Sequence, residues 1–164
     1  MPWITGNRYL SIDEMTVNAQ EIMNQLTSRG WTKNAVAGML GNMQTESTIN
    51  PGVWESLSPN VNNGYGLVQW TPATKLISWA ESEGLDYTSG DAQLQRIDWE
   101  VVNNQQWIAT SQYPMSFQEF KASTLTPEYL AQVFIRNYER PRYPNQPIRS
   151  TQARYWYDNL EGSG

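Results

Sequence analysis

Glu46 is the residue of this chain whose type and position first suggest chemistry. It lies in the run GNMQTESTINPG (residues 41–52), where a helical pattern meets the helix-breaking triplet Asn50-Pro51-Gly52. A carboxylate in the last turn of a helix faces the negative end of the helix dipole, and Glu46 also borders the apolar stripe that contains Met43. Both effects raise the pKa of a carboxyl, which favours the protonated form that a general acid needs. The alternative is that the helix ends earlier and that solvent surrounds Glu46.

The composition restricts the available chemistry to carboxylates, Tyr, Lys, hydroxyls and amides. The 164 residues include neither Cys nor His, which excludes disulfides, Cys nucleophiles, His-based serine triads and the usual zinc ligand sets. We therefore expect no metal and no cofactor. The net charge of -5 argues against nucleic acid or an anionic membrane as the partner. No apolar stretch predicts a transmembrane helix, and the start MPWITGNRYLSIDEM does not resemble a signal peptide.

A second candidate segment is GYGLVQWTP (residues 64–72). It reads as a glycine-rich turn in which the aromatic residues Tyr65 and Trp70 flank the amide side chain of Gln69. The chain is rich in such aromatics, with eight Trp and nine Tyr, and both types join a flat apolar face to a polar group that suits sugars. The segment could line a sugar-binding cleft. The alternative is a tight hairpin packed on the core.

Two helices must position Glu46. A capping box formed by Ser11 and Glu14 predicts a first helix that ends at Gly30. Thr32 can cap a second helix, whose apolar residues follow the helical period as far as Glu46. This second helix carries no charge between its first turn and Glu46, and it contains two glycines that allow close packing. We expect it to be buried on most sides, at the centre of the domain.

The rest of the chain predicts a small irregular or short-stranded lobe at about 47–70, followed by further helices. These are expected at 71–83, from near Asp91 to Trp107 or Ile108, around 117–120, from Thr126 to Pro141, and at about 153–160. The fold class is therefore mainly α, in one domain over residues 1–160. Residues 161–164 are expected to be a linker or an artificial chain end, and the default oligomeric state is a monomer.

Taken together, these motifs resemble the lysozyme superfamily. Glu46-Ser47, Gly66-Leu67-Val68-Gln69 and Tyr138-Glu139-Arg140-Pro141 are similar to motifs of goose-type lysozymes and lytic transglycosylases. The runs GWTK, GMLGNMQTESTINPG, LVQWTP, YERP and YWY resemble the phage tail lysozyme family more closely, over residues 8–160. Members of that family are the domains with which phage tail-tip proteins open the Gram-positive cell wall.

The resemblance implies an α+β lysozyme-like fold and a peptidoglycan glycosidase with Glu46 as the catalytic acid. It implies that Gln69 lines the glycan cleft beside Tyr65 and Trp70, and Ser47 is the neighbouring candidate for substrate binding. Tyr138 matches a tyrosine near the acid of related transglycosylases, although this segment lacks their Tyr-Asn-Ala-Gly form. The expected partners are glycan strands, other tail proteins or a C-terminal second domain, and the expected location is the phage tail.

A glycosidase normally uses two carboxyl groups, and no second one stands in an obvious position. The candidates are Glu55, Asp98, Glu100 and Glu139. Asp98 and Glu100 are expected on a solvated helix face, and Glu139 is expected to pair with the arginine at 140 or 142. Three mechanisms stay open: Glu46 acting alone with an amide-positioned water, participation of the substrate's N-acetyl group, or attack by the muramyl 6-hydroxyl to give an anhydro product.

The bond cleaved also stays open. A muramidase would cut between N-acetylmuramic acid and N-acetylglucosamine, whereas an N-acetylglucosaminidase or a lytic transglycosylase would use the same glutamate differently. Two readings of another class are a carbohydrate-binding module that has lost turnover and a structural tail domain. The presence of Glu46 argues against the first, because a binding groove needs no general acid.

Overall fold

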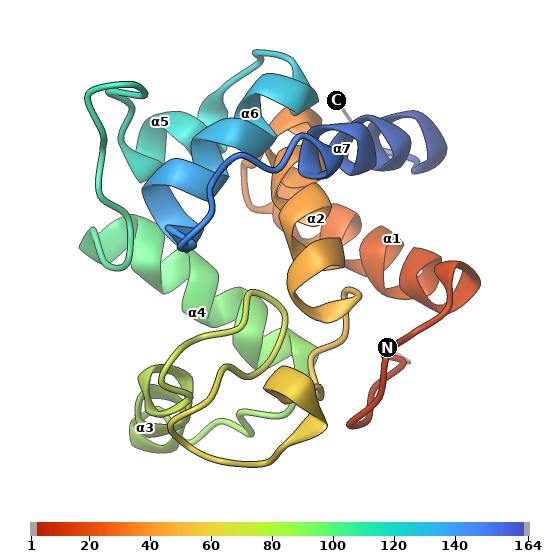
Figure 1. The fold of residues 1–164 in the computed structure, drawn as a ribbon, viewed down its shortest axis with the longest axis vertical. Helices are drawn as coiled ribbons and strands as arrows, with labels where there is room; N and C mark the ends of the chain where they lie inside the picture. Colours follow the sequence, from red (N-terminus) through yellow and green to blue (C-terminus); the bar gives the residue numbers. More distant parts are fainter. Residues whose placement is uncertain (1–2, 163–164) are drawn as a thin grey trace.

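The computed structural model describes residues 3–162, and its helices surround one central helix, α2 (Figure 1). The elements are α1 (Ile12–Ser28), α2 (Lys33–Ser47), the 3-10 helix η1 (Glu55–Leu57), α3 (Thr74–Ser82), α4 (Gly90–Asn103), α5 (Phe117–Ala122), α6 (Pro127–Phe134), the π-helix η2 (Ile135–Glu139) and α7 (Ile148–Asn159). Among residues 3–162, pairing between extended segments is limited to isolated bridges around Tyr65. The predicted mainly α class is confirmed.

The first two helices begin and end where the sequence predicts. The Glu14 backbone N–H donates to the Ser11 hydroxyl at 3.2 Å, and the Ser11 N–H donates to the Glu14 carboxylate at 3.0 Å. Gly30 follows α1 with φ of +93°, and the Thr32 hydroxyl caps α2 by accepting the Ala35 N–H at 3.0 Å. In the described part of the chain, no helix combines the length and the apolar character needed to cross a membrane.

The central helix α2 is buried along most of its length, as expected. It packs against α6 and α7 on one side and against α1 on another. A Cβ atom at Gly38 would lie 2.9 Å from the Leu130 Cβ of α6, and one at Gly41 would lie 2.8 Å from the Ala153 nitrogen of α7. The two glycines therefore allow the close approach that brings α6 and α7 against the centre of the molecule.

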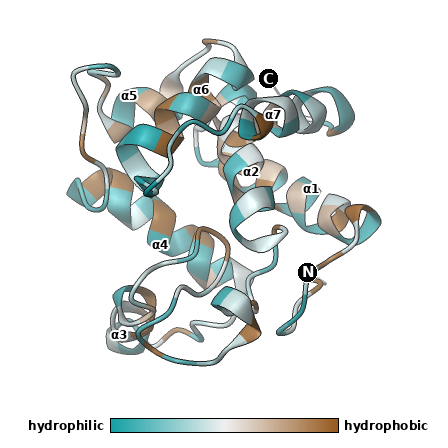
Figure 2. Ribbon diagram, viewed as in Figure 1, coloured by the Kyte–Doolittle hydropathy of each residue, from teal (hydrophilic) through white to brown (hydrophobic). Residues whose placement is uncertain are grey.

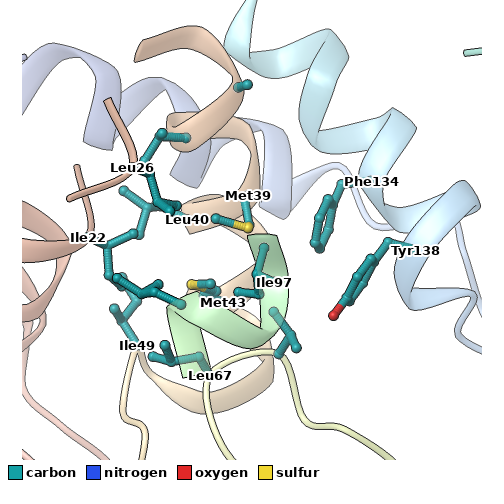
Figure 3. Packing of buried hydrophobic residues seen from close by; sticks show 14 of the residues in the cluster. Ile22, Leu26, Met39, Leu40, Met43, Ile49, Leu67, Ile97, Phe134 and Tyr138 are labelled. Carbon is teal, nitrogen blue, oxygen red and sulfur yellow. The ribbon is translucent and has the colours of Figure 1, made fainter. Parts of the chain in front are cut away.

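The hydrophobic core surrounds the same helix. Hydrophobic residues recur along α2, α4 and α6 (Figure 2). Those that are buried pack together around Met39, Leu40 and Met43 of α2, with Ile97 of α4 and Phe134 of α6 close by (Figure 3). Because this core holds α2 from several directions, the C-terminal end of the helix has a fixed position.

The segment from Thr48 to Ala73 forms the irregular lobe that the sequence predicts. The Ser47 hydroxyl at the end of α2 donates to the Leu67 carbonyl at 2.7 Å. The Gln93 side chain of α4 accepts the Leu67 N–H at 2.9 Å and donates to the Pro51 carbonyl at 2.8 Å. These buried hydrogen bonds hold a segment without regular secondary structure against α2 and α4.

Several helix ends differ from the predictions. The helix expected from residue 71 begins at Thr74, because Ala73 is held in a turn by N–H bonds to the carbonyls of Val61 and Asn63. The helix α4 ends at Asn103, since Asn104 takes the left-handed conformation with φ of 51°. Trp107 therefore lies outside α4. The helix expected up to Pro141 is regular only to Phe134 and continues as the π-helix η2.

The C-terminal segment contacts α1. The Glu161 N–H donates to the Gln20 side chain at 3.0 Å, and the Gln20 amide donates to the Glu161 carbonyl at 2.7 Å. Residues 163 and 164, the second half of the expected linker at 161–164, lie outside the described residues. Glu161 itself is attached to the helical body by these two bonds.

Candidate active site

Two adjoining cavities lie between the end of α2, the irregular lobe and the residues around η2. The first has a volume of about 540 Å³ and is lined by Tyr9, Glu46, Val53, Trp54, Glu55, Ser56, Gln69, Thr71, Glu139, Pro141 and Arg142. The second, of about 190 Å³, is lined by Val68, Gln69, Trp70, Thr71, Lys75, Gln106, Tyr138, Glu139 and Arg140. They share Gln69, Thr71 and Glu139, so we treat them as one groove with these residues at the junction.

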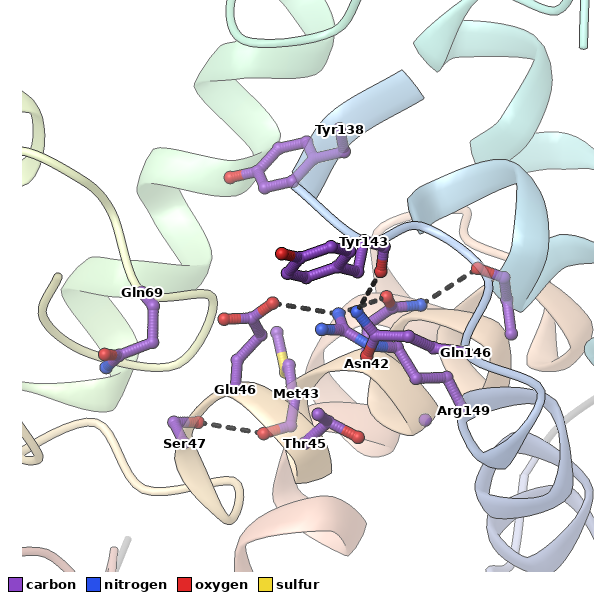
Figure 4. A network of polar contacts seen from close by, with 12 residues as sticks. Asn42, Met43, Thr45, Glu46, Ser47, Gln69, Tyr138, Tyr143, Gln146 and Arg149 are labelled. Carbon is purple, nitrogen blue, oxygen red and sulfur yellow. Dashed lines mark hydrogen bonds and ion pairs between the residues drawn. The ribbon is translucent and has the colours of Figure 1, made fainter. Parts of the chain in front are cut away.

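Glu46 stands in the last turn of α2 with its carboxyl in the wall of the groove (Figure 4). Its side chain is 19% exposed, and its Oε2 lies 2.8 Å from Nη1 of Arg149. Burial raises the pKa of Glu46 above its usual range, and the charge of Glu55 acts in the same direction, while Arg149 opposes both. The predicted direction of the pKa shift is confirmed, and its main cause is burial.

Arg149 is the partner of Glu46 that sequence reasoning missed. Its side chain is 4% exposed and is held by three groups: the Glu46 carboxylate, the Asn42 Oδ1 at 2.8 Å from Nη1, and the Gln146 Oε1 at 2.8 Å from Nε (Figure 4). Arg149 lies on the buried face of α7 together with Ala153 and Trp156. A charged residue in register with such a buried stripe is the signal that could have revealed it.

Gln69 lies across the groove from Glu46, at the end of the tight turn that begins at Tyr65. The turn is closed by two bonds between the Tyr65 and Trp70 backbones, at 3.0 and 3.1 Å. Gln69 has a left-handed φ of 58°, and its amide nitrogen donates to the carbonyls of Val53 and Gly66 at 3.1 and 3.0 Å. Both amide N–H groups are therefore used, and the group that Gln69 can offer a ligand is its carbonyl oxygen.

Ser47, Tyr65 and Trp70 are brought near the groove but are covered by protein. Ser47 is buried by its bond to the lobe, and Tyr65, which is 2% exposed, packs its ring against Trp54 at 4.4 Å between centroids. Trp70 lines the second cavity while its indole N–H donates to Glu100 at 3.0 Å. These three side chains hold the groove wall in place, and Trp54 and Tyr9 are the aromatic residues that line the first cavity.

Tyr138 and Glu100 form a buried pair behind the second cavity. The Tyr138 hydroxyl donates to Glu100 Oε1 at 2.6 Å, so it is directed to Glu100 and not to Glu46. Glu100 is fully buried, also accepts from Arg96 at 3.1 Å, and burial raises its pKa. The expectation that Glu100 lies on a solvated face is wrong, because α4 turns this residue into the core.

Asp98 is also bound to other residues of the protein. Its carboxylate accepts the Trp31 indole N–H at 2.8 Å and an Arg29 N–H at 3.0 Å. It is partly buried between these two side chains, which corrects the expectation of a freely solvated position. Neither Asp98 nor Glu100 lines the groove, so neither can reach a substrate held against Glu46.

Glu139, at the end of the π-helix η2, lines both cavities. Its Oε2 is buried and has no hydrogen-bond partner among the described residues. Burial raises the pKa of Glu139 well above its usual range, and the nearby charge of Glu46 raises it further. The expected ion pair with Arg140 or Arg142 is absent from the described residues, because Arg140 is bound to backbone carbonyls and Arg142 lies over the Tyr143 ring. Short π-helical segments often occur at functional sites, which fits this placement.

Glu55 lies in the wall of the first cavity, from the 3-10 helix η1 of the lobe. Its Oε1 accepts the Gly64 backbone N–H at 2.8 Å, which fixes the side chain. Of the four candidate second carboxyls, the structure thus brings Glu55 and Glu139 to the groove. Among residues 3–162, no group of three or more acidic, His or Cys side chains is arranged as a metal site.

Comparison with known proteins identifies a matching family and a similar phage protein. The profile of the phage tail lysozyme family matches residues 17–160. The chain is also 58% identical over 159 residues to a protein of Bacillus phage B103 described as "Morphogenesis protein 1". The match covers 96% of this chain and 43% of that protein, so the chain spans less than half the length of this relative.

Proposed function

Because this chain belongs to the phage tail lysozyme family, we propose that it cleaves the glycan strands of peptidoglycan, at the β-1,4 bond between N-acetylmuramic acid and N-acetylglucosamine. The observation that carries the proposal is the position of Glu46. Its carboxyl lies in the wall of a groove, and burial raises its pKa, so that it can arrive protonated at a glycosidic oxygen. The groove provides the site, and the rigid end of α2 aims the acid into it.

Arg149 sets how strongly Glu46 holds its proton. Without a cation, burial would favour the protonated form of this carboxyl more strongly and would slow the loss of its proton. The ion pair at 2.8 Å favours the ionised form, which Glu46 must adopt after it has protonated the leaving group. The balance of burial and Arg149 lets one carboxyl serve first as acid and then as base.

Glu139 and Glu55 are the proposed sources of the second carboxyl function. Within residues 3–162, Glu139 has an oxygen without a hydrogen-bond partner at the junction of the two cavities, while Glu55 has one oxygen bound to Gly64 and no hydrogen bond to the other. The ionised form is costly for Glu139 because of its burial, so Glu55 is better suited to activate a water, and Glu139 to hold a proton beside Glu46. The carbonyl of Gln69, across the groove, can orient the sugar or the water.

The proposed setting is the tail of a phage that infects a Gram-positive host. The relative from a Bacillus phage supports this setting, and its greater length supports a larger protein with additional domains. Delivery by a virion would also explain how an acidic protein approaches a polyanionic wall, because attachment of the particle replaces electrostatic steering.

The test compares the protein with Glu46→Gln on purified Gram-positive sacculi, with soluble fragments analysed by mass spectrometry. We expect Glu46→Gln to reduce fragment release roughly a hundred- to ten-thousandfold, the scale of losing an essential general acid. Glu81→Gln, an exposed acid on α3, is the matched control and should release fragments normally. Equal release by the protein and Glu46→Gln would remove Glu46 from the mechanism, and no release by either would favour a binding or structural domain.

The same fragments identify the bond and the second carboxyl. Reducing muramic acid at the new end supports muramidase activity, reducing glucosamine supports an N-acetylglucosaminidase, and an anhydro end supports a lytic transglycosylase. Glu55→Gln and Glu139→Gln, each measured over a range of pH, separate the two candidates. Replacing the residue that activates water should lower the rate at every pH. Replacing a neighbour that only holds a proton should mainly displace the pH profile.

A further inference from the structure

The second cavity of the groove contains two cations, Lys75 and Arg140, that the proposed hydrolysis does not use. Within residues 3–162, neither forms an ion pair. Lys75 donates to the Gln106 side chain at 3.3 Å, and Arg140 donates to the backbone carbonyls of Gln106 and of Asn137, the latter at 2.9 Å. Neutral oxygens therefore hold both cations in place without cancelling their charge.

The backbone is held in unusual conformations around this cavity. Gln69, Gln106 and Arg140 all line it, and their φ angles of 58°, 68° and 49° lie in the left-handed region that non-glycine residues rarely adopt. Such residues cluster at ligand-binding positions, because packing must hold them there at a cost in energy. Here the conformation at Arg140 places a cation at the edge of the groove directly after Glu139.

The charge of this cavity is opposite to that of the protein as a whole. The chain has a net charge of -5, but among the described residues Glu139 is the one acidic residue that lines the second cavity. Burial raises the pKa of Glu139 well above its usual range, which disfavours the charged form that would compensate the two cations, and Glu139 forms no ion pair with either of them within residues 3–162. A local positive site in an acidic protein selects for an anionic ligand group and fixes its position.

We propose that the second cavity is a subsite for an anionic substituent of the glycan strand, a carboxylate or a phosphate, which Lys75 and Arg140 bind. The inference rests on the proposed function, since the strand must run through the groove past Glu46. The volume of about 190 Å³ equals roughly six water volumes, which is enough for a carboxylate or a phosphate group. In a Gram-positive wall this group is either a carboxylate of the peptide stem or a phosphate of a polymer attached to the strand.

The experiment compares Lys75→Gln with Lys121→Gln, which removes the same charge on α5, outside the groove. Lys75 is exposed, so its replacement is compatible with folding. The substrates are intact sacculi, sacculi stripped of phosphodiester-linked polymers, and stripped sacculi whose carboxylates have been amidated. Fragment release measures turnover, and co-sedimentation of the same variants in a Glu46→Gln background measures binding.

We expect Lys75→Gln to weaken binding and turnover roughly two- to fivefold relative to Lys121→Gln on intact sacculi. If the difference disappears on stripping, the substituent is a phosphate, and if it disappears only on amidation, it is a carboxylate. A difference that persists after both treatments, or no difference on intact sacculi, would overturn the subsite. If the unsubstituted protein releases no fragments, the proposed hydrolysis is refuted, but the binding comparison still tests the subsite. If the protein binds none of the three kinds of sacculi, the subsite is overturned as well.

Discussion

Replacing Arg149 with Met removes the cation that lies 2.8 Å from Glu46 and keeps a side chain of similar length. An opposite charge at this range lowers the pKa of a carboxyl by about one to three units, so its loss should raise the pKa of Glu46 by that amount. This corresponds to roughly 1.4 to 4 kcal/mol of interaction with the ionised form. The pair is largely buried, which places the expected shift toward the upper half of the range.

The sign of the effect on activity follows from the role of Glu46. A general acid works while it is protonated, so the rate falls as the pH rises through its pKa. In Arg149→Met the pKa is higher, and the alkaline limb of the pH profile should move upward by about one to three units. The measurement is fragment release from sacculi across the pH range, together with a carbon NMR titration of the Glu46 carboxyl. Arg149→Lys keeps the charge and should shift the limb much less.

This reasoning would be refuted by an alkaline limb that stays in place or moves to lower pH in Arg149→Met. A loss of folding must be separated from that result. The variant leaves the acceptors of Asn42 and Gln146 without their donor, at a cost of about 1–3 kcal/mol for the buried Asn42 and less for the half-buried Gln146. The profile is therefore measured well below the unfolding temperature of each variant, with circular dichroism as the check of the folded state.

Two further predictions concern stability. Glu100→Ala removes the buried acceptor of the Tyr138 hydroxyl and the Trp70 indole, and it should lower the free energy of unfolding by about 3–5 kcal/mol in urea denaturation. Glu100→Gln should lose less stability. An unchanged midpoint in Glu100→Ala would contradict the buried pairing. Gly41→Ala places a Cβ 2.8 Å from the Ala153 nitrogen and should cost about 1–3 kcal/mol as α2 and α7 move apart. Thermal unfolding tests this, and a melting temperature at or above that of the unsubstituted protein would show that the interface is loose.

The sequence predicts the features of this fold that depend on neighbouring residues. The capping box at Ser11 and the cap at Thr32 are local hydrogen-bond patterns, and both are found where the residue types indicate. The uncharged surface of α2 predicts its central position because a helix without charges must be covered by others. The location of Glu46 at the end of that helix follows from the same local signals.

The parts of the site that sequence reasoning missed depend on contacts between distant segments. Arg149 binds Asn42, which lies 107 residues earlier, and no local pattern indicates that α7 docks against the end of α2. The expectation that Glu100 is solvated is wrong because the period of α4 alone does not show how much of the helix other elements cover. Which of the four candidate carboxyls reach the groove was therefore decided by packing and not by spacing.

The π-helix η2 makes the backbone geometry between Thr126 and Pro141 a component of the site. A π turn contains one residue more than the α-helical turn that would otherwise continue α6. If the five residues of η2 continued as a regular α-helix, the side chains that follow them would be rotated by about 100° around the axis. Glu139 would then leave the groove and Arg140 would leave the second cavity, although no residue that contacts the substrate had been substituted. Each of these side chains is thus placed by the geometry of the π turn as much as by residue type.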